Sequence, residues 1–387
     1  MLMNNKNKLI SDLKKDLPCV LGTLEECYAY SQDASNQREI KGLPDAVVFV
    51  ETIEQVQKVV KVANKYQTPI ICRGAGTNVV GACLCEHGGI VLNFSKMNKI
   101  LEISPENMTA IVQPGVVLGD LQREVEKLGL FYPPDPSNLA VSTIGGSIAQ
   151  NSAGAKSFKY GTTRDYVIDL KVVTANGEIL QTGANTIKNA TGYNLANLFV
   201  GSEGTLGIVV EATLKLIPMP ESKKVLGAYF DTVEQAVNAV NAIIEQKIYP
   251  ATIDFMDKNA IMTVEKFYSA NLLTDKEALL LVEIDGFECS MEHQENIIVN
   301  ILKNSEASEI QVSHNIDEYN KIWTARHLSM GACARLKPNV TTDDVIVPRE
   351  NLAKLVLGIR EICEKYNLTV CMVGHVGDGS VHPQIPI

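Results

Sequence analysis

The chain has little positive charge and no long apolar segment, and each shortage argues against a class of protein. Its 35 Lys and Arg residues stand against 45 Asp and Glu residues, which gives a formal net charge of −10. Nucleic-acid surfaces need clustered Lys and Arg, so we expect no nucleic-acid partner. No segment approaches the ~20 uninterrupted apolar residues that a membrane span needs. The polar N-terminus does not have the pattern of a secretory signal either.

The nine cysteines lack the spacing of a metal or cluster site. Only Cys83 and Cys85 lie close together, as C-x-C, and no C-x-x-C occurs in the chain. This argues against an iron–sulfur cluster or a zinc ribbon on this chain. An odd number of cysteines without a secretory signal favours reduced thiols and a cytoplasmic location.

The order of apolar runs, amphipathic stretches and breakers predicts two mixed helix–sheet regions after an N-terminal helical segment at residues 1–40. The first region, residues 41–220, opens with a strand–helix–strand unit and ends where Pro218-Met-Pro220 breaks a strand pattern. In residues 221–387 the order strand, helix, strand, strand, helix, strand is typical of a ferredoxin-like layer that can cap another domain.

A glycine-rich loop at residues 73–82 follows the second strand of the first region. Glycine lets backbone N–H groups approach an anion closely, and ligands of α/β sheets gather at the carboxyl ends of strands. The loop is not a Walker A motif, because Ala82 stands where Lys is required, and its spacing does not fit the dinucleotide fingerprint. A single loop of this kind is most often a turn.

Two further glycine loops lie at residues 142–151 and 201–208. Three such loops in one region are harder to explain as simple turns. Together with Arg73 in the first loop, they suggest an extended anionic ligand that also has a heteroaromatic part. The loops resemble those of the vanillyl-alcohol-oxidase type of FAD-binding domain, the PCMH fold. Within that type, the loops resemble those of the group of glycolate oxidase D-subunits, D-lactate dehydrogenases and D-2-hydroxyglutarate dehydrogenases. The motifs are Arg73-Gly-Ala-Gly-Thr, Pro133-Pro-Asp-Pro-Ser, Thr143-Ile-Gly-Gly, Lys159-Tyr-Gly-Thr-Thr-Arg-Asp-Tyr, Gly192-Tyr-Asn-Leu and Gly201-Ser-Glu-Gly-Thr-Leu-Gly.

This resemblance implies an α+β protein with a two-subdomain PCMH-type FAD-binding domain followed by a ferredoxin-like α/β cap domain. Relatives with a covalent flavin carry His where this chain has Thr77, so the resemblance implies non-covalent FAD. By position, it implies FAD contacts at Arg73, Gly74, Ala75, Gly76, Thr77, Asn78, Gly81, Asp135, Thr143, Gly145, Gly146, Asn151, Glu203, Gly204 and Ile208.

His375 and His382 are the candidate metal ligands. On spacing alone they are either two ligands of one divalent metal or two unrelated polar residues. The stretch Gly374-His-Val-Gly-Asp-Gly-Ser-Val-His resembles the metal motif of this group, which implies a divalent cation such as zinc, manganese or iron. The family's later Glu-His-Gly segment, which supplies a third ligand and a base, has no counterpart in this sequence.

Arg326 is the candidate substrate residue. Trp323-Thr-Ala-Arg326 resembles the family's Trp-x-x-Arg, whose guanidinium binds the substrate carboxylate; an exposed helical Arg is the alternative. The segment that begins at Asp343-Asp344 is interpreted as structural, and His327 as incidental. With the two histidines, Arg326 would complete a catalytic set for oxidising a small 2-hydroxy acid, of the glycolate or D-lactate type, by hydride transfer to flavin N5.

Electrons would leave through a partner protein, an iron–sulfur subunit or an electron-transferring flavoprotein, because this chain has no cluster motif. Two alternatives stay open. The chain could be a non-catalytic or impaired FAD-binding subunit that lacks the completed metal site. An FAD-linked reductase of cell-wall precursors would share the flavin domain, but Arg326 and the two histidines argue against it.

Overall fold

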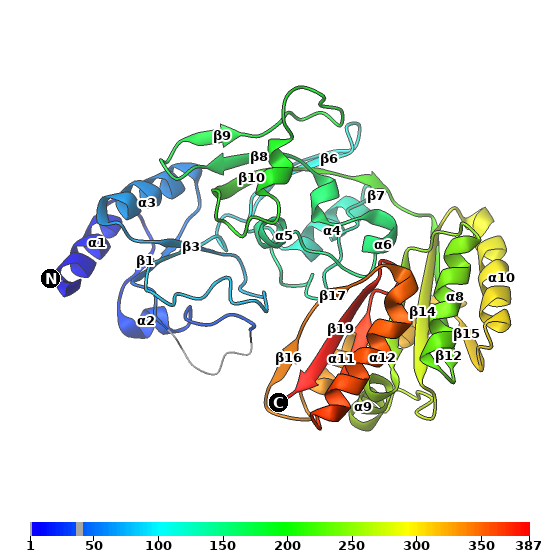
Figure 1. Cartoon of the computed structure of the whole chain (residues 1–387). Coiled ribbons are helices and arrows are strands. Elements are labelled where there is room, and N and C mark those ends of the chain that lie inside the picture. The colour runs from blue at the N-terminus through cyan, green and yellow to red at the C-terminus, as the bar shows by residue number, and fades with distance from the viewer. Residues whose placement is uncertain (1, 36–41) are drawn as a thin grey trace. The chain divides into compact units, whose positions relative to one another are not determined.

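A computed structural model describes residues 2–35 and 42–387 of the chain and divides it into two compact units. Unit 1 extends to Ala153 and resumes over Thr162–Met219. Unit 2 consists of Gly154–Gly161 together with Pro220–Ile387. The short segment Gly154–Gly161 therefore belongs to unit 2 although the flanking sequence belongs to unit 1. Figure 1 shows the elements of each unit.

The first sheet of unit 1 positions the glycine loop. Its strand order is β1 (Val20–Leu21), β2 (Ala46–Phe49), β4 (Ile90–Asn93) and β3 (Ile70–Arg73), and the last three strands are parallel. Helices α1 (Leu2–Asp16) and α3 (Ile53–Tyr66) pack against this sheet, and the short α2 spans Leu24–Tyr28. The Thr52 side chain caps α3, whose buried residues recur at helical spacing. Strand β3 ends at Arg73, so the loop begins where the parallel sheet ends.

The second sheet of unit 1 is antiparallel. It runs β5 (Ile100–Ser104), β6 (Thr109–Val112), β10 (Ile208–Lys215), β8 (Val167–Val173) and β9 (Ile179–Gln181). Asn176-Gly177 joins β8 to β9, and Gly177 has a φ of +82°, as a tight hairpin requires. The remaining elements of the unit are α4 (Leu118–Glu126), α5 (Ile144–Gln150), α7 (Leu195–Phe199), the 3-10 helix η1 (Thr163–Tyr166) and the pair β7 (Leu130–Phe131) and β11 (Ile217–Pro218).

From Ser222 onward, unit 2 follows the expected ferredoxin-like order, with one further helix inserted between its second and third strands. Its elements are β12 (Ser222–Phe230), α8 (Val233–Glu245), β13 (Thr252–Asp257), β14 (Ala278–Gly286), α10 (Glu288–Asn304) and β15 (Glu309–Val312), and the strands lie in the order β15-β12-β14-β13. The sheet continues from β13 through β18 (Cys371–Gly374) and β19 (Ser380–Pro386) to β16 (Val340–Thr342), with β17 (Val345–Ile346) paired to β19. The other helices are α6 (Ser157–Tyr160), α9 (Lys258–Tyr268), α11 (Ile316–Cys333), η2 (Arg349–Asn351) and α12 (Leu352–Lys365).

Two buried clusters line the two faces of this sheet. On β14, Leu280 and Val282 pack into the core with helices α8, α10 and α12. The alternate residues Leu279 and Leu281 pack with α9 and α11. Because successive side chains of a strand point to opposite faces, Glu283 lies on the α11 side, where Tyr319 donates to it. Asp254 of β13 and Arg326 of α11 also lie on this second face.

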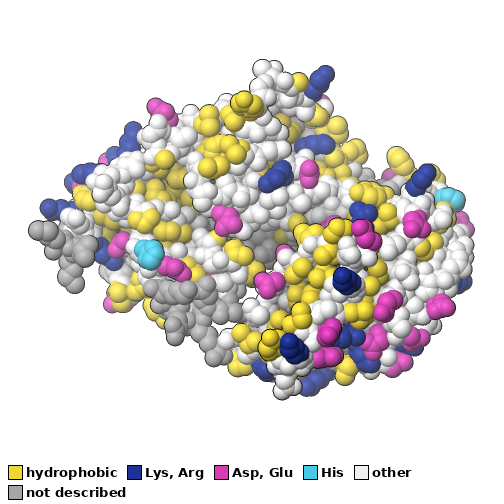
Figure 2. Space-filling model, viewed as in Figure 1, with side chains coloured by type: hydrophobic (Ala, Val, Ile, Leu, Met, Phe, Trp, Pro, Cys, Tyr) yellow, Lys and Arg dark blue, Asp and Glu magenta, His cyan; other side chains and the backbone are white. Residues whose placement is uncertain are grey.

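Two properties of the surface bear on possible partners. Figure 2 shows Lys and Arg side chains dispersed among Asp and Glu over the face in view, with no single concentration of positive charge there. Among the described helices, none combines the length and the apolar character that crossing a bilayer demands.

Candidate functional site

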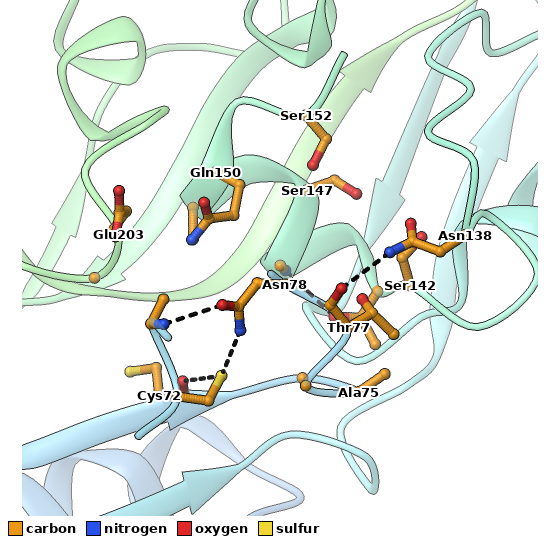
Figure 3. Close-up of a pocket in the computed structure, with 18 residues that line it drawn as sticks. Cys72, Ala75, Thr77, Asn78, Asn138, Ser142, Ser147, Gln150, Ser152 and Glu203 are labelled. Atoms are coloured by element: carbon orange, nitrogen blue, oxygen red, sulfur yellow. Dashed lines mark hydrogen bonds between the residues drawn. The ribbon is translucent and has the colours of Figure 1, made fainter. Parts of the chain in front are cut away.

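A cavity of about 120 Å³ in unit 1 lies between the glycine loop, helix α5 and the 203–204 turn. Figure 3 shows Thr77 and Asn78 from the loop, Ser147 and Gln150 from α5, and Glu203 from the turn around it. A second cavity of about 70 Å³ adjoins it. The two cavities share Cys72, Gly74, Thr143, Gly146, Ala149 and Gly204, and together they are called the cleft.

Small residues create this cleft. A Cβ at Gly74 would clash with the Thr143 hydroxyl, which caps α5 by accepting a hydrogen bond from the Gly146 amide. A Cβ at Gly145 would lie 2.6 Å from the Pro114 Cβ. A side chain at Gly74 would therefore push the glycine loop away from α5, and one at Gly145 would push α5 away from Pro114. Glu203 adopts a φ of +53°, a conformation that non-glycine residues adopt rarely and that turns the chain at the cleft wall.

Most of the cofactor residues expected from the sequence line the cleft. Twelve of them do so: Arg73, Gly74, Ala75, Gly76, Thr77, Asn78, Thr143, Gly145, Gly146, Glu203, Gly204 and Ile208. The Arg73 guanidinium already has partners: its Nη1 donates to the Gln32 carbonyl at 2.7 Å, and it lies over the Tyr30 ring.

Gly81, Asp135 and Asn151 are outside the lining of both cavities. Asn151 ends α5 in the left-handed conformation, and its Oδ1 accepts from the Thr162 hydroxyl and the Arg164 amide. Its contacts therefore tie α5 to the η1 segment.

Sequence reasoning missed several polar residues of the cleft. Asn138 donates to the Thr77 carbonyl at 3.3 Å. The hydroxyls of Ser142 and Ser147 are buried and have no hydrogen-bond partner among the described residues. An unpartnered buried hydroxyl is costly, so both hydroxyls favour a polar ligand in the cleft. Glycine backbone on one side and unpaired hydroxyls on the other fit an extended phosphate-bearing cofactor.

A second constellation lies within unit 2, around Asp254 of β13. Arg326 of α11 donates from Nε to Asp254 Oδ1 at 2.9 Å, and His375 Nδ1 lies 3.2 Å from Asp254 Oδ2. The Asp254 side chain is 1 % exposed, so these two partners take the place of water. Burial alone would raise the pKa of Asp254, but Arg326 and His375 outweigh burial and hold it well below its usual range. The carboxylate is therefore ionised.

His375 and His382 are neighbours, with ring centroids 4.9 Å apart in an edge-to-face arrangement. Their two carboxylate partners differ: Asp254 contacts His375 Nδ1, and Asp344 contacts His382 Nδ1. Contact with His382 lowers the pKa of Asp344, whereas the Asp254 charge overcomes burial and raises the pKa of His375. Because both Nδ1 atoms face carboxylates, Nε2 is the nitrogen that each ring has for another partner.

The structure brings Arg326, His375 and His382 together around residues that the sequence did not single out. Asp254 was missed, and Asp344 belongs to a segment interpreted as structural. His327, interpreted as incidental, stacks on Trp323 with a centroid separation of 5.6 Å. No group of three or more His, Cys, Asp or Glu residues suited to a metal ion is found within the residues that the structure covers.

Two known protein-family models match this chain, one in each half of the sequence. Residues 44–183 match an FAD binding domain model, and residues 219–386 match the C-terminal domain of FAD linked oxidases. Glycolate oxidase subunit GlcD of Bacillus subtilis (strain 168) is 44% identical over 354 residues, which cover 92% of this chain and 75% of that protein. D-lactate dehydrogenase of Anaerostipes hadrus is 35% identical, covering 88% and 73% of the two chains.

More distant proteins share the fold. D-2-hydroxyglutarate dehydrogenase of Stutzerimonas stutzeri (strain A1501) is 31% identical over 95% of this chain and 79% of its own. A solved structure of p-cresol methylhydroxylase superposes with a TM-score of 0.82 at 18% identity, over 99% of this chain and 82% of that one. An alkyldihydroxyacetonephosphate synthase structure gives a TM-score of 0.81 at 23% identity, over 98% and 80%. These two structures establish the fold alone.

Proposed function

Because this chain belongs to the family of FAD-linked oxidases that includes glycolate oxidase subunit GlcD and D-lactate dehydrogenase, we propose that it oxidises a small 2-hydroxy acid to the 2-oxo acid with FAD. The observation that carries the proposal is that one buried carboxylate, Asp254, contacts both Arg326 and His375, whose ring lies beside that of His382. Such a set suits a molecule with a carboxylate and a neighbouring hydroxyl.

The cleft of unit 1 is our proposed site for FAD. Backbone amides of residues 74–78 would donate to the pyrophosphate, and the Ser142 and Ser147 hydroxyls would gain the partners that they lack. We propose non-covalent binding, because Thr77 stands where tethered relatives have His. Bound FAD supplies the hydride acceptor, N5 of its isoalloxazine ring.

Arg326 is our proposed ligand for the substrate carboxylate. Asp254 occupies its Nε, and Nη1 makes only a long contact of 3.4 Å to the Ser329 hydroxyl. The outer edge of the guanidinium, formed by Nη1 and Nη2, can therefore donate two parallel hydrogen bonds to a carboxylate. Ion pairing to Asp254 holds that edge in one orientation.

His375 and His382 are our proposed ligands for a divalent cation such as zinc, manganese or iron, through their Nε2 atoms. Two histidines are fewer ligands than closed structural sites use, so open positions would be available to the substrate. A cation there would lower the pKa of the 2-hydroxyl group. Together with Arg326, the two histidines form the proposed catalytic set.

Electron transfer to a partner protein, an iron–sulfur subunit or an electron-transferring flavoprotein, completes the proposal, because the sequence has no cluster motif. We also propose a cytoplasmic location, which the nine free cysteines support.

The test is anaerobic reduction of the FAD-loaded protein by a panel of D- and L-2-hydroxy acids, with and without added zinc or manganese. We expect one enantiomer of a small 2-hydroxy acid to bleach the visible flavin absorbance. Bleaching by dithionite but by no 2-hydroxy acid would instead support the non-catalytic alternative.

A further inference from the structure

We propose that Asp254 is a positioning residue that fixes the substrate arginine and one histidine of the proposed metal pair with a single carboxylate. The inference rests on the proposed function for the roles of Arg326 and His375. It goes further by assigning to a buried strand residue the task of holding both side chains in one geometry.

Asp254 reaches its partners from the middle of the sheet. Asp254 lies on β13. The next residue, Phe255, pairs with Gly374, which is the last residue of β18, so His375 comes directly after this pairing. Arg326 approaches from α11, which covers this face of the sheet. Oδ1 accepts from Arg326 Nε at 2.9 Å and from the Phe255 amide at 2.8 Å, while Oδ2 faces His375 Nδ1 at 3.2 Å.

The chemistry of this contact requires a carboxylate. An ionised Asp only accepts hydrogen bonds, so it can accept from a guanidinium and an imidazole at the same time. With Nδ1–H donated to Asp254, the His375 ring must present its Nε2 lone pair on the opposite side. An amide at this position would offer one oxygen, and its NH₂ group would face a second donor.

Glu283 provides a matched control on the next strand. It is also 1 % exposed, and its Oε2 accepts from Tyr319 at 2.6 Å, but it forms no hydrogen bond or ion pair with Arg326 or His375 in the described structure. Asp254→Asn and Glu283→Gln therefore each replace a buried carboxyl group of the same sheet with its amide. Only the first removes an acceptor that the proposed site uses.

The first measurement is the tautomer of His375, from the ¹⁵N chemical shifts of labelled, metal-free protein at high pH, where the imidazole is neutral. We expect Nδ1–H in the wild-type protein and in E283Q, and a shift toward Nε2–H in D254N. His375 in the Nε2–H form in the wild-type protein would overturn the inference without any variant.

The second measurement is the affinity for zinc, by competition with a chromophoric chelator. Loss of a partner that orients a metal-bound histidine typically weakens binding 10–100-fold, so we expect at least a tenfold loss in D254N and less than a twofold change in E283Q. The KM for the 2-hydroxy acid should rise about tenfold in D254N. Wild-type values for the tautomer, the zinc affinity and the KM in folded D254N would contradict the positioning role.

Failure of this inference differs from failure of the proposed function. If no 2-hydroxy acid reduces the wild-type protein but His375 changes tautomer in D254N alone, the proposed substrate is wrong and the positioning contact stands. If the wild-type protein turns over and D254N retains its tautomer and affinities, the positioning role is wrong and the proposed function stands.

Discussion

At the scale of single residues, the two tasks that we propose for Arg326 need a guanidinium. Its Nε donates to Asp254, and its Nη1, which makes only a 3.4 Å contact with the Ser329 hydroxyl, would share a bound carboxylate with Nη2. Arg326→Lys keeps the positive charge, but a single ammonium group cannot donate to Asp254 and to a substrate carboxylate from separate nitrogens. We therefore expect kcat/KM for the 2-hydroxy acid to fall about 100-fold, which corresponds to ~2.7 kcal/mol of transition-state stabilisation. Steady-state kinetics against E283Q as control checks the effect. A loss below threefold would show that charge alone is sufficient.

Asp257 provides a pH-dependent prediction outside the proposed site. Burial raises the pKa of Asp257 to about 6, above the ordinary Asp value, although its Oδ1 accepts from the Ala260 and Met372 amides. A raised pKa means that folding favours the protonated form. The free energy of unfolding should therefore fall by about 3 kcal/mol as pH rises from about 4 to 6, and this contribution should stay constant at higher pH.

Asp257→Asn should remove this dependence, because Asn can still cap α9 through its oxygen. Urea unfolding of both proteins at several pH values measures the effect. We expect the stability of D257N relative to the wild-type protein to increase between pH 4 and pH 7. A difference that does not vary with pH would mean that Asp257 titrates normally in the folded state.

The sequence could reveal only part of the proposed site, for a physical reason. Arg326, His375 and His382 belong to short contiguous motifs, which can be recognised in the sequence without knowledge of the fold. Asp254 is a single acidic residue within a strand, and only the pairing of β13 with β18 and the packing of α11 bring its partners to it. Such contacts depend on tertiary structure and have no local pattern.

At the scale of elements, the β18–β19 hairpin carries both histidines and depends on close backbone packing. A Cβ at Gly374 would lie 2.7 Å from the Val381 Cα and would clash with the Ser380 carbonyl. We expect Gly374→Ala to lower the free energy of unfolding by at least about 2 kcal/mol, because backbone atoms cannot move aside cheaply.

Gly358→Ala is the matched control for that substitution. Gly358 lies inside α12, and a Cβ there meets no atom within 4 Å. The same chemical change should therefore stabilise the protein by about 0.5–1 kcal/mol through helix propensity. Thermal unfolding of the two variants should give shifts of opposite sign, and shifts of the same sign would contradict the packing argument.

Elements with regular patterns were predictable, and irregular ones were not. The amphipathic helices α3 and α8 and the ferredoxin-like succession of strands and helices along the chain follow from residue spacing. Helix α11 shows no clear stripe, because its buried residues include Ser329, Ala325 and Ala332 beside Trp323. Strand β19 contains Pro383 and His382, which weaken any alternating pattern.

At the scale of the whole molecule, each unit has its own core, and Phe158 belongs to that of unit 2. The residue is 5 % exposed, and the centroid of its ring lies 4.6 Å from that of Tyr249. Phe158→Ala should cost about 3–5 kcal/mol of stability in unit 2. Hydrogen exchange should show lower protection there than in the wild-type protein and unchanged protection in the sheets of unit 1. Equal loss of protection in both units would mean that they unfold as one.

The segment Gly154–Gly161 has a consequence for recombination between related genes. Lys159 pairs with Asp285, and Tyr160 donates to the same carboxylate at 2.7 Å. These eight residues therefore pack with unit 2, although the sequence on both sides of them belongs to unit 1. A chimera joined only at residue 220 would combine one parent's Phe158, Lys159 and Tyr160 with the other parent's sheet. Viable crossovers therefore have to exchange residues 154–161 together with everything after 220.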